Sequence, residues 1–400
     1  MSSARISAIK FFPENPSVVI ATAGKGGERG IFRSTDAGAT WTEQVTTDSD
    51  WADLEIGALR GDGSRTIWAC SGGNPGIIRY SDNQGVSWTT VTSPVSGSQN
   101  PLQIATSKTN PDRVYLMSTT ARRLFRSDNK GASWTDISAG FQNGSNNYNW
   151  SQGWYDYYLD ATTRNTANGP VDVLFAGLID IVMSIDGGTT WRNIGGSNFT
   201  AAYSGTAIVH QDNHNIAIDP NNPLRALVAT DGGVFRMLYN NTNDTVSWTN
   251  LNRNLGITQF YTLSVHPTNK DYIKGGTQDN STPHSFGNLI QWGNPGAGDG
   301  AGCAINPINP NIQYNSSQFH GLDRTTNSYS SSSGFAPNFG GDSVPFIGAL
   351  WLDPNDPTNV YVNTNYLWRY KEGTGAWTAR LGGQLLSAGG QVRSMGFSTN

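Results

Sequence analysis

The chain has 400 residues and a formal net charge of −4; 36% of its residues are hydrophobic, 14% are charged, and it contains 47 Gly and 13 Trp. This length is enough for one large domain or two ordinary ones. Few charges with many Gly and aromatic residues are typical of an all-β protein with many turns. The net charge provides no basic surface for nucleic acid, which we exclude as a partner. No apolar run is long enough to span a membrane, and residues 1–5 show no signal peptide.

In chain order, the first recurring element is a pair of alternating strand-like runs joined by a turn that contains Pro with Asn or Asp. Such a turn between two alternating runs predicts a β-hairpin. The pattern covers residues 6–23, 102–119, 214–230, 261–276, 303–317 and 350–364.

A second element follows the hairpin and contains the motif Ser-x-Asp/Asn-x-Gly-x-Ser/Thr-Trp, which occupies residues 34–41, 81–88, 127–134 and 184–191. Its third residue can bond backbone N–H groups of the turn that it starts, and its Gly permits a positive φ. The Trp begins the next strand and supplies a large apolar surface. We therefore expect these residues of the motif to be structural: Asp36, Asn83, Asn129, Asp186, Trp41, Trp88, Trp134 and Trp191.

Together the two elements give four strands per repeat. We count eight repeats, at residues 6–44, 51–91, 102–136, 150–193, 214–250, 260–293, 302–330 and 347–380. Four-stranded units in series, none of which can bury both faces alone, predict an all-β fold. We expect a β-propeller of four-stranded antiparallel blades, with eight blades favoured over seven, rather than a pair of β-sandwiches. We assign residues 1–380 to the propeller and residues 381–400 to a closing strand or to the start of a further blade.

The strand order also sorts the connections of each blade between two ends. The Pro/Asn turns and the Asp/Gly turns share one end, whereas the loops between second and third strands share the other end with the links between blades. Because irregular loops on a rigid scaffold often carry function, we expect function at that second end. The two cysteines, Cys70 and Cys303, are expected to be small buried residues rather than a disulfide.

The Ser-x-Asp-x-Gly-x-Thr-Trp repeats resemble the Asp-box, or bacterial neuraminidase repeat, of sialidases, xyloglucan-degrading propeller hydrolases and the sortilin N-terminal domain. Other phrases resemble those of large secreted bacterial propellers of the sortilin-like or glycosyl-hydrolase-like kind, and they lie at residues 152–156, 210–214, 231–236, 275–280 and 298–300. The resemblance implies a β-propeller in an extracellular or cell-surface location. The chain lacks the Arg-Ile-Pro phrase of sialidases. Its loop at residues 23–30 also lacks the Asp that xyloglucan hydrolases carry in the first blade.

His210, Asp212 and His214 form the sharpest constellation, because alternate residues of a strand share one face. Imidazole and carboxylate groups arranged in this way can bind a divalent ion, so we predict a Ca²⁺ or Zn²⁺ site at these three residues. The alternative is a hydrogen-bonded polar lining of the channel mouth without a metal.

Further polar residues fall in loops of the same expected face. We predict that Asp212, Asp279 and Asp299 are catalytic, because glycoside hydrolysis needs an acid together with a base or nucleophile. The alternatives for these carboxylates are Ca²⁺ binding and the capping of loop amides. The predicted ligand-binding residues are His210, His214, Asp231, Gln278, His320, Trp150 and Tyr155.

An aromatic cluster at Trp150, Trp154, Tyr155, Tyr157 and Tyr158 is expected either to stack on sugars or to join the core between blades. With the carboxylates, it leads us to predict an extracellular carbohydrate-directed propeller that binds or hydrolyses a polysaccharide or glycan. The alternative is a non-catalytic adhesion or surface-assembly module of a larger secreted protein, with another surface protein as its partner. Enzymatic activity stays open; an enzyme of this kind would be a glycoside hydrolase.

Overall fold

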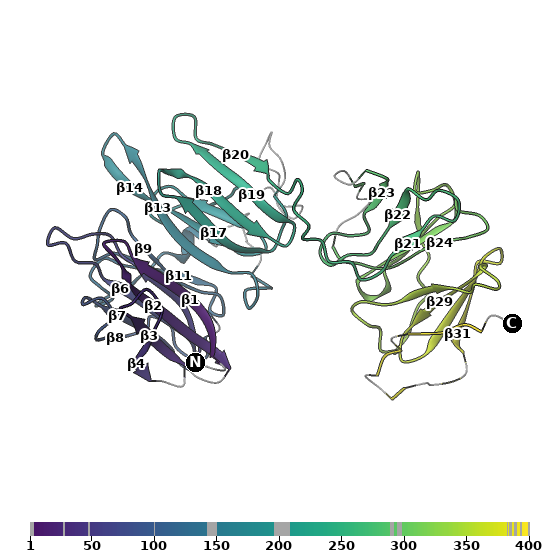
Figure 1. The fold of residues 1–400 in the computed structure, drawn as a ribbon, viewed down its shortest axis with the longest axis horizontal. Coiled ribbons are helices and arrows are strands. Elements are labelled where there is room, and N and C mark those ends of the chain that lie inside the picture. The colour runs from purple at the N-terminus through teal and green to yellow at the C-terminus, as the bar shows by residue number, and fades with distance from the viewer. Residues whose placement is uncertain are drawn as a thin grey trace. The chain divides into compact units, whose positions relative to one another are not determined.

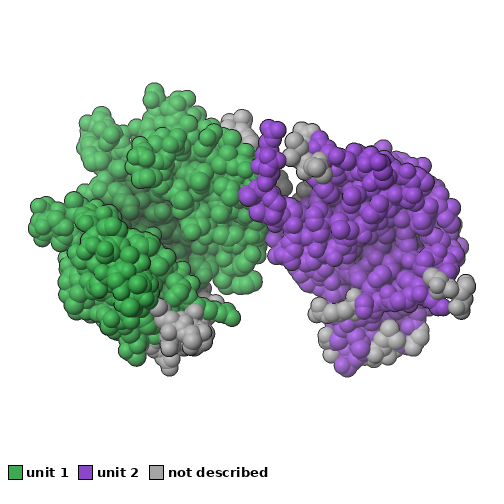
Figure 2. Space-filling view, viewed as in Figure 1, with its two compact units in different colours: residues 1–252 green, residues 253–400 purple. Residues whose placement is uncertain are grey.

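The structure, a computed structural model, describes most of the chain. Outside the description lie residues 1–3, 27–28, 47–48, 100, 142–149, 196–208, 289–291, 294–297, 382, 384–385, 388–389, 393 and 399–400. The chain divides into two compact units, Met1–Asn252 (unit 1) and Arg253–Asn400 (unit 2), which Figure 2 distinguishes by colour.

The described part of unit 1 contains five four-stranded antiparallel sheets, each made of strands that are consecutive in the chain (Figure 1). The first sheet consists of β1 (Ala4–Phe12), β2 (Asn15–Gly26), β3 (Gly30–Ser34) and β4 (Thr42–Thr46). The second consists of β5 (Trp51–Ile56), β6 (Ile67–Gly73), β7 (Gly76–Ser81) and β8 (Thr89–Val91). The third consists of β9 (Leu102–Thr106), β10 (Val114–Ser118), β11 (Arg123–Ser127) and β12 (Thr135–Asp136). The fourth consists of β13 (Tyr158–Thr166), β14 (Gly169–Gly177), β15 (Ile181–Ser184) and β16 (Arg192–Asn193). The fifth consists of β17 (Asn213–Asp219), β18 (Asn222–Thr230), β19 (Gly233–Asn240) and β20 (Thr245–Asn250).

Unit 2 contains three further antiparallel sheets among its described residues. The first has three strands, β21 (Ser264–Val265), β22 (Tyr272–Lys274) and β23 (His284–Phe286). The second consists of β24 (Gly300–Ile305), β25 (Gln313–Ser317), β26 (Leu322–Thr325) and β27 (Ser333–Gly334). The third consists of β28 (Leu350–Leu352), β29 (Asn359–Asn363), β30 (Leu367–Lys371) and β31 (Ala376–Leu381). Helical structure in the described chain is limited to α1 (Ser138–Phe141) in unit 1 and a single 3₁₀ turn, η1 (Gln318–His320), in unit 2.

The hydrophobic cores lie between successive sheets. One core joins Ile20 and Ile31 of the first sheet to Leu54 and Ile67 of the second, and equivalent cores link each later pair of sheets in unit 1. A further core joins the last two sheets of unit 2. A middle strand such as β10 is therefore buried along its whole length, as expected for a sheet covered on both faces.

These sheets confirm the predicted all-β fold of antiparallel blades, and one sheet corresponds to each of the eight predicted repeats. The sixth sheet has three strands among the described residues where four were predicted, and the seventh extends past residue 330 to β27. The fourth repeat differs at its start, because β13 begins at Tyr158 rather than near residue 150. The preceding segment forms a compact turn in which Gly153 N–H donates to Trp150 O (3.0 Å) and Asp156 N–H donates to Gln152 O (2.8 Å). This turn carries several of the aromatic residues of the predicted cluster.

In unit 1, backbone hydrogen bonds join connections that were predicted to share an end. At one end, the Asp/Gly turn bonds the Pro/Asn turn of the same sheet: Ala37 N–H donates to Ser17 O (2.9 Å), and Lys130 N–H donates to Asp112 O (3.0 Å). At the other end, the loop between second and third strands bonds a link: Gly73 N–H donates to Gln99 O (2.8 Å). We call these the turn end and the loop end.

The four copies of the repeated motif form nearly the same turn. In the first, Gly38 N–H donates to Ser34 Oγ (2.8 Å) and Thr40 N–H donates to Asp36 Oδ1 (2.8 Å). The other copies repeat these two bonds around Asn83, Asn129 and Asp186. The indole N–H of Trp41, Trp88 and Trp191 donates to the Gly of its own turn, whereas that of Trp134 donates to Thr92 O. These bonds join residues within each turn; that the turn residues are purely structural stays a prediction.

The structure also reveals a fifth, degenerate copy of this turn in unit 2. Tyr329 N–H donates to Thr325 Oγ1 (3.0 Å), and Ser331 N–H donates to Asn327 Oδ1 (2.9 Å). Tyr329 occupies the position of the Gly, with φ of 65°. The sequence motif misses this copy because both its Gly and its Trp are replaced, although the Thr, Asn and Ser that make the hydrogen bonds are kept.

Three further predictions concern the cysteines, a membrane span and the C-terminal tail. Cys70 and Cys303 are both buried, and both are free thiols, as predicted. No helix in the described chain is long and apolar enough to cross a membrane. After β31, Val392 N–H donates to Thr364 O (3.2 Å) and Asn355 Nδ2 donates to Ser398 O (2.7 Å), so this tail lies against the last sheet of unit 2. Its role as a closing strand stays a prediction.

Candidate functional site

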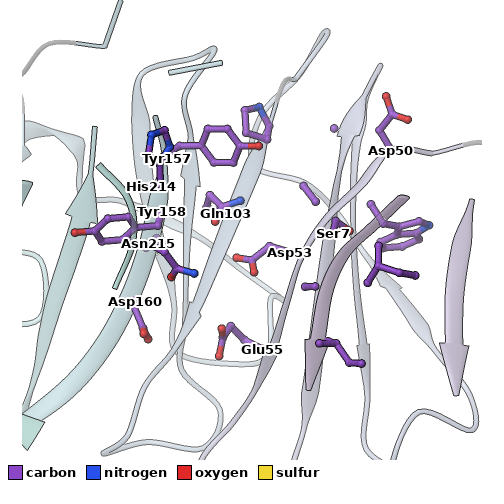
Figure 3. A pocket seen from close by; sticks show the side chains of 18 of the residues that line it. Ser7, Asp50, Asp53, Glu55, Gln103, Tyr157, Tyr158, Asp160, His214 and Asn215 are labelled. Atoms are coloured by element: carbon purple, nitrogen blue, oxygen red, sulfur yellow. The ribbon is translucent and has the colours of Figure 1, made fainter. Parts of the chain in front are cut away.

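A cavity of about 730 Å³ lies within unit 1, where the first strands of all five sheets converge. These strands are β1, β5, β9, β13 and β17, and Figure 3 shows side chains from them directed into the same space. Convergence of the first strands on one space is the radial arrangement of propeller blades around an axis.

The cavity wall carries four carboxyl groups, of Asp50, Asp53, Glu55 and Asp160, and two basic groups, of Arg5 and Lys10. Asp53 and Glu55 lie two residues apart on β5 and therefore on one face, and Asp160 comes from β13 (Figure 3). Lys10 on β1 binds Glu55, with Nζ 2.6 Å from Oε1. The two oxygens of Asp53 accept hydrogen bonds from the backbone N–H groups of Leu54 (2.8 Å) and Ile104 (2.9 Å), which fix its orientation.

Burial and neighbouring charge change the ionisation of these acids. Burial, reinforced by the negative charge of Glu55, raises the pKa of Asp53 to about 7. The same two causes, in the same order, raise the pKa of Asp160 to about 6. The cavity therefore contains acids that keep a proton close to neutral pH beside Glu55, whose negative charge is balanced by Lys10.

Aromatic residues from the turn at residues 150–156 stand at the loop end of this cavity. Trp154 is 65% exposed and Tyr155 is 42% exposed, and their ring centroids lie 5.6 Å apart. Tyr155 also packs edge-on against the His214 imidazole, with centroids 4.8 Å apart. Both Tyr155 and His214 line the cavity, so the exposed aromatic pair continues into its wall.

His214 lies between two carboxylates. Its Nε2 is 2.5 Å from Asp231 Oδ1, and its Nδ1 is 3.7 Å from Asp156 Oδ1. Asp156 is fully buried. Asp212 lies beside this group: Gln152 Nε2 donates to its Oδ1 (3.1 Å), and Asp231 N–H donates to its carbonyl O (3.2 Å). Burial is the main cause that raises the pKa of the Asp212 carboxyl, and a hydrogen bond with Asp156 opposes the rise.

The predicted His210–Asp212–His214 triad differs from this arrangement. β17 begins only at Asn213, and Asp212 has φ of 61°, so the three residues do not alternate along one strand. The His210 Nδ1 lies 2.9 Å from Gln211 O, and its ring packs against Gly232, where an added Cβ would lie 2.3 Å from Cγ. His214 and Asp231 instead meet Asp156, and all three offer ligand atoms within 4.8 Å of one another.

Four predicted site residues belong to unit 2. Asp299 accepts hydrogen bonds from Asp279 N–H (3.0 Å) and from Gln318 Nε2 (2.6 Å), and is buried. Gln278 N–H donates to Gln259 O (2.9 Å). His320 is 1% exposed, its Nε2 lies 2.6 Å from Asn363 O, and burial lowers its pKa. Asp299 therefore caps loop amides, and burial of His320 argues against contact with a ligand there. Catalysis by Asp279 and Asp299 stays untested.

The predicted aromatic cluster separates into core and surface members. Trp150 packs on Phe141 in the core, with ring centroids 5.0 Å apart, and is only 6% exposed. Tyr158 is also buried in a core cluster. Trp154 and Tyr155 are the exposed members, because the turn at 150–156 directs alternate sides of the segment toward the core and toward solvent. Of the predicted ligand contacts, burial argues against Trp150 and exposure favours Tyr155.

Sequence reasoning missed the cavity acids Asp53, Glu55 and Asp160, and also Asp156. The available signal was the pattern Asp-x-Glu on a predicted first strand, where a strand packed on both faces would otherwise be apolar. Nothing in the sequence indicated that Asp156 meets His214, because Asp156 lies in the turn before β13 and His214 lies in β17.

Comparisons with known proteins bear on the fold. No protein-family model matches the chain, and no curated protein matches it. Among solved structures, an ancestral GH74 enzyme superposes with a TM-score of 0.55 at 15% identity, covering 94% of this chain and 65% of that one. The chain has a β-propeller fold. A GH74 enzyme from Niastella koreensis gives a TM-score of 0.45 at 16% identity (93% and 65% coverage), and the GH74 xyloglucanase from Xanthomonas campestris gives 0.43 at 13% (92% and 63%).

This chain therefore spans slightly less than two-thirds of the length of each of these three proteins. At such low identity the likeness concerns the path of the backbone. The chemistry of the propeller has to be argued from its own side chains.

Proposed function

We propose that the propeller is an extracellular carbohydrate-directed protein whose unit 1 binds a glycan at the loop end of its central cavity. The observation that carries this proposal is the exposed Trp154–Tyr155 pair, which adjoins a polar cavity lined by carboxyl groups. Aromatic faces stack on the C–H faces of sugars, and carboxylates accept hydrogen bonds from sugar hydroxyls. A cavity of about 730 Å³ is within the usual size of small-ligand sites.

The polarity of the wall favours a sugar over an apolar ligand. Gln103, Asp53 and Asn215 come from three different first strands, and each presents hydrogen-bonding groups to the same cavity (Figure 3). Lys10 adds a donor beside Glu55. A ligand with many hydroxyl groups can satisfy such a wall, whereas an apolar ligand would leave the wall desolvated without partners.

Glycoside hydrolysis is a second candidate, favoured by the different ionisation of neighbouring acids. Asp53, with a pKa of about 7, can donate a proton at neutral pH, and Glu55, which binds Lys10 Nζ, is the second carboxyl group on the same strand face. An acid and a carboxylate in one cavity are the groups that glycoside hydrolases use. If no hydrolysis occurs, the same contacts serve a binding or surface-assembly module.

The test combines glycan binding with product analysis. A panel of soluble oligosaccharides of glucose, xylose, mannose or galactose is tested by isothermal titration, and we expect binding within this panel. The double variant Trp154→Ala, Tyr155→Ala should weaken that binding at least tenfold. Phe286→Ala is a matched control, because Phe286 is also 65% exposed but lies on β23 of unit 2. Release of reducing ends that Asp53→Asn abolishes would support hydrolysis; binding without release would support the module. Failure of the whole panel to bind would contradict the proposal.

A further inference from the structure

We infer that Asp156, His214 and Asp231 form a binding site for a divalent transition ion, with Zn²⁺ as the first choice, on the wall of the unit 1 cavity. The three residues come from separate places: the turn before β13, the start of β17 and the loop after β18. They bring one imidazole and two carboxylates together, and one ligand atom from each lies within 4.8 Å of the other two.

A small ion requires a defined spacing between its ligand atoms. Zn²⁺ binds imidazole nitrogen and carboxylate oxygen at about 2.0–2.2 Å, which places ligand atoms of a tetrahedral site about 3.3–3.6 Å apart. His214 Nδ1 lies 3.7 Å from Asp156 Oδ1, and His214 Nε2 lies 2.5 Å from Asp231 Oδ1, so the two carboxylates face different ring nitrogens. Because one ion binds only one of these nitrogens, the half-buried His214 and Asp231 have to rotate so that both carboxylates face the same nitrogen. The three ligand atoms, which lie within 4.8 Å of one another, then close to this spacing.

The donor set distinguishes between the two ions predicted from the sequence. Ca²⁺ prefers six to eight oxygen ligands, whereas imidazole with carboxylate is a typical set for Zn²⁺ and other transition ions. The charge of the cluster also favours a cation, because Asp212, whose carbonyl O accepts from Asp231 N–H (3.2 Å), adds a third carboxyl group beside the set. A divalent ion would neutralise this concentration of acids around one imidazole.

The surroundings hold the ligands in place and give access to solvent. Gln152 anchors Asp212 and Tyr155 packs against the His214 ring, so the turn at residues 150–156 supports the cluster from one side. Such supporting contacts orient ligands and strengthen metal binding. His214 also lines the cavity, so an ion bound there would be reachable from it. This inference does not depend on glycan binding, since the ion would bind without any sugar.

The experiment uses the full chain, stripped with EDTA and dialysed, then titrated separately with ZnCl₂, MnCl₂ and CaCl₂, with bound metal measured by mass spectrometry. We expect one Zn²⁺ per chain and an increase in Tm on Zn²⁺ addition. His214→Ala should weaken Zn²⁺ binding at least a hundredfold and remove the Tm increase. Asp231→Asn should weaken binding at least tenfold. Far-UV circular dichroism checks that each variant is folded.

His210→Ala is the discriminating control, because His210 is close in sequence but outside the three-residue set. It should change Zn²⁺ affinity less than about threefold. Equal losses in His210→Ala and His214→Ala would overturn the assignment in favour of the triad predicted from sequence. Preferential binding of Ca²⁺, no stoichiometric binding of any of the three ions, or unchanged binding in His214→Ala would each overturn it as well.

Discussion

Asp36 at the turn end of unit 1 and Asp53 in its cavity are the same type of residue under opposite conditions. Asp36 is exposed and accepts hydrogen bonds from the Thr40 hydroxyl, the Thr40 backbone N–H and Ser34, which lower its pKa to about 2. Asp53 is half-buried beside Glu55, and its pKa rises to about 7. The turn end therefore uses carboxylates as fixed hydrogen-bond acceptors, whereas the cavity holds acids that can exchange a proton near neutral pH.

The four copies of the turn motif show that the turn end does not depend on the charge of the carboxylate. At the third position of the motif, two copies have Asp and two have Asn, and all make the same bonds to the backbone. The turn thus needs an oxygen at this position and not a charge. In the cavity, the ionisation of Asp53 depends on the charges of Glu55 and Lys10, so replacement by Asn should change its behaviour. Four predictions test this difference, from the largest expected effect to the smallest.

The largest effect on stability is expected when a buried hydroxyl group that accepts a hydrogen bond at the turn end is removed. Ser127 Oγ accepts from the buried Gly131 N–H (2.8 Å), and Ser127→Ala would leave that donor unsatisfied. An unsatisfied buried donor costs about 1–3 kcal/mol, and urea unfolding should show a loss of about 2 kcal/mol. Ser133→Ala is the control, because Ser133 is exposed and should lose far less. A glycan affinity that falls with Ser127→Ala in folded protein would contradict the separation of the two ends.

The next effect is a dependence of the free energy of unfolding on pH, which arises from Asp53. Its pKa rises from 3.8 to about 7 on folding, so between these values the folded state binds more protons than the unfolded state. Stability therefore falls as the pH rises through this window. Denaturation at pH 5, 6, 7 and 8 should show this fall in the natural chain and a smaller one in Asp53→Asn. Identical slopes in the two proteins would show that Asp53 has an ordinary pKa.

A smaller change is expected at Lys10. Its positive charge lowers the pKa of Asp53 and neutralises Glu55. Lys10→Met should therefore raise the pKa of Asp53 further and move the midpoint of the pH dependence to higher pH. The loss of stability should be only about 1 kcal/mol at pH 8, because the ammonium group is partly exposed to solvent. Carbon-13 NMR of the Asp carboxyl groups measures the shift directly, and an unmoved Asp53 resonance would refute the coupling.

The smallest effect is expected for Asp36→Asn. Asn83 already makes the equivalent contacts, with Nδ2 donating to Ser87 Oγ (2.8 Å) and Oδ1 accepting from Ser87 N–H (2.9 Å). Asn at position 36 should reproduce them, so Tm at neutral pH should change by less than about 2 °C. A drop comparable to that of Ser127→Ala would mean that the charge of Asp36 matters and that the comparison between the two ends is wrong.

The sequence was sufficient for local structure that short-range contacts dictate. The Pro/Asn turns, the repeated Asp/Gly turns and alternating strands predicted eight blades, because each of these patterns is satisfied within about 40 residues of chain. The sequence did not reveal the fifth turn, because its Gly and Trp are replaced although Thr325 and Asn327 keep the hydrogen-bond pattern. It also predicted the wrong side-chain alternation around Asp212, because that residue has a positive φ.

The candidate site was decided by the tertiary structure. Asp53 and Asp160 are far apart in the chain and line one cavity because the first strands of the blades converge there. Asp156, in the turn before β13, likewise meets His214 only through the tertiary structure. A strand pattern tells which face a side chain occupies but not which other strand it faces. The raised pKa of Asp53 likewise arises from burial and from the charge of Glu55 within the packed cavity, so the residue type alone could not reveal it.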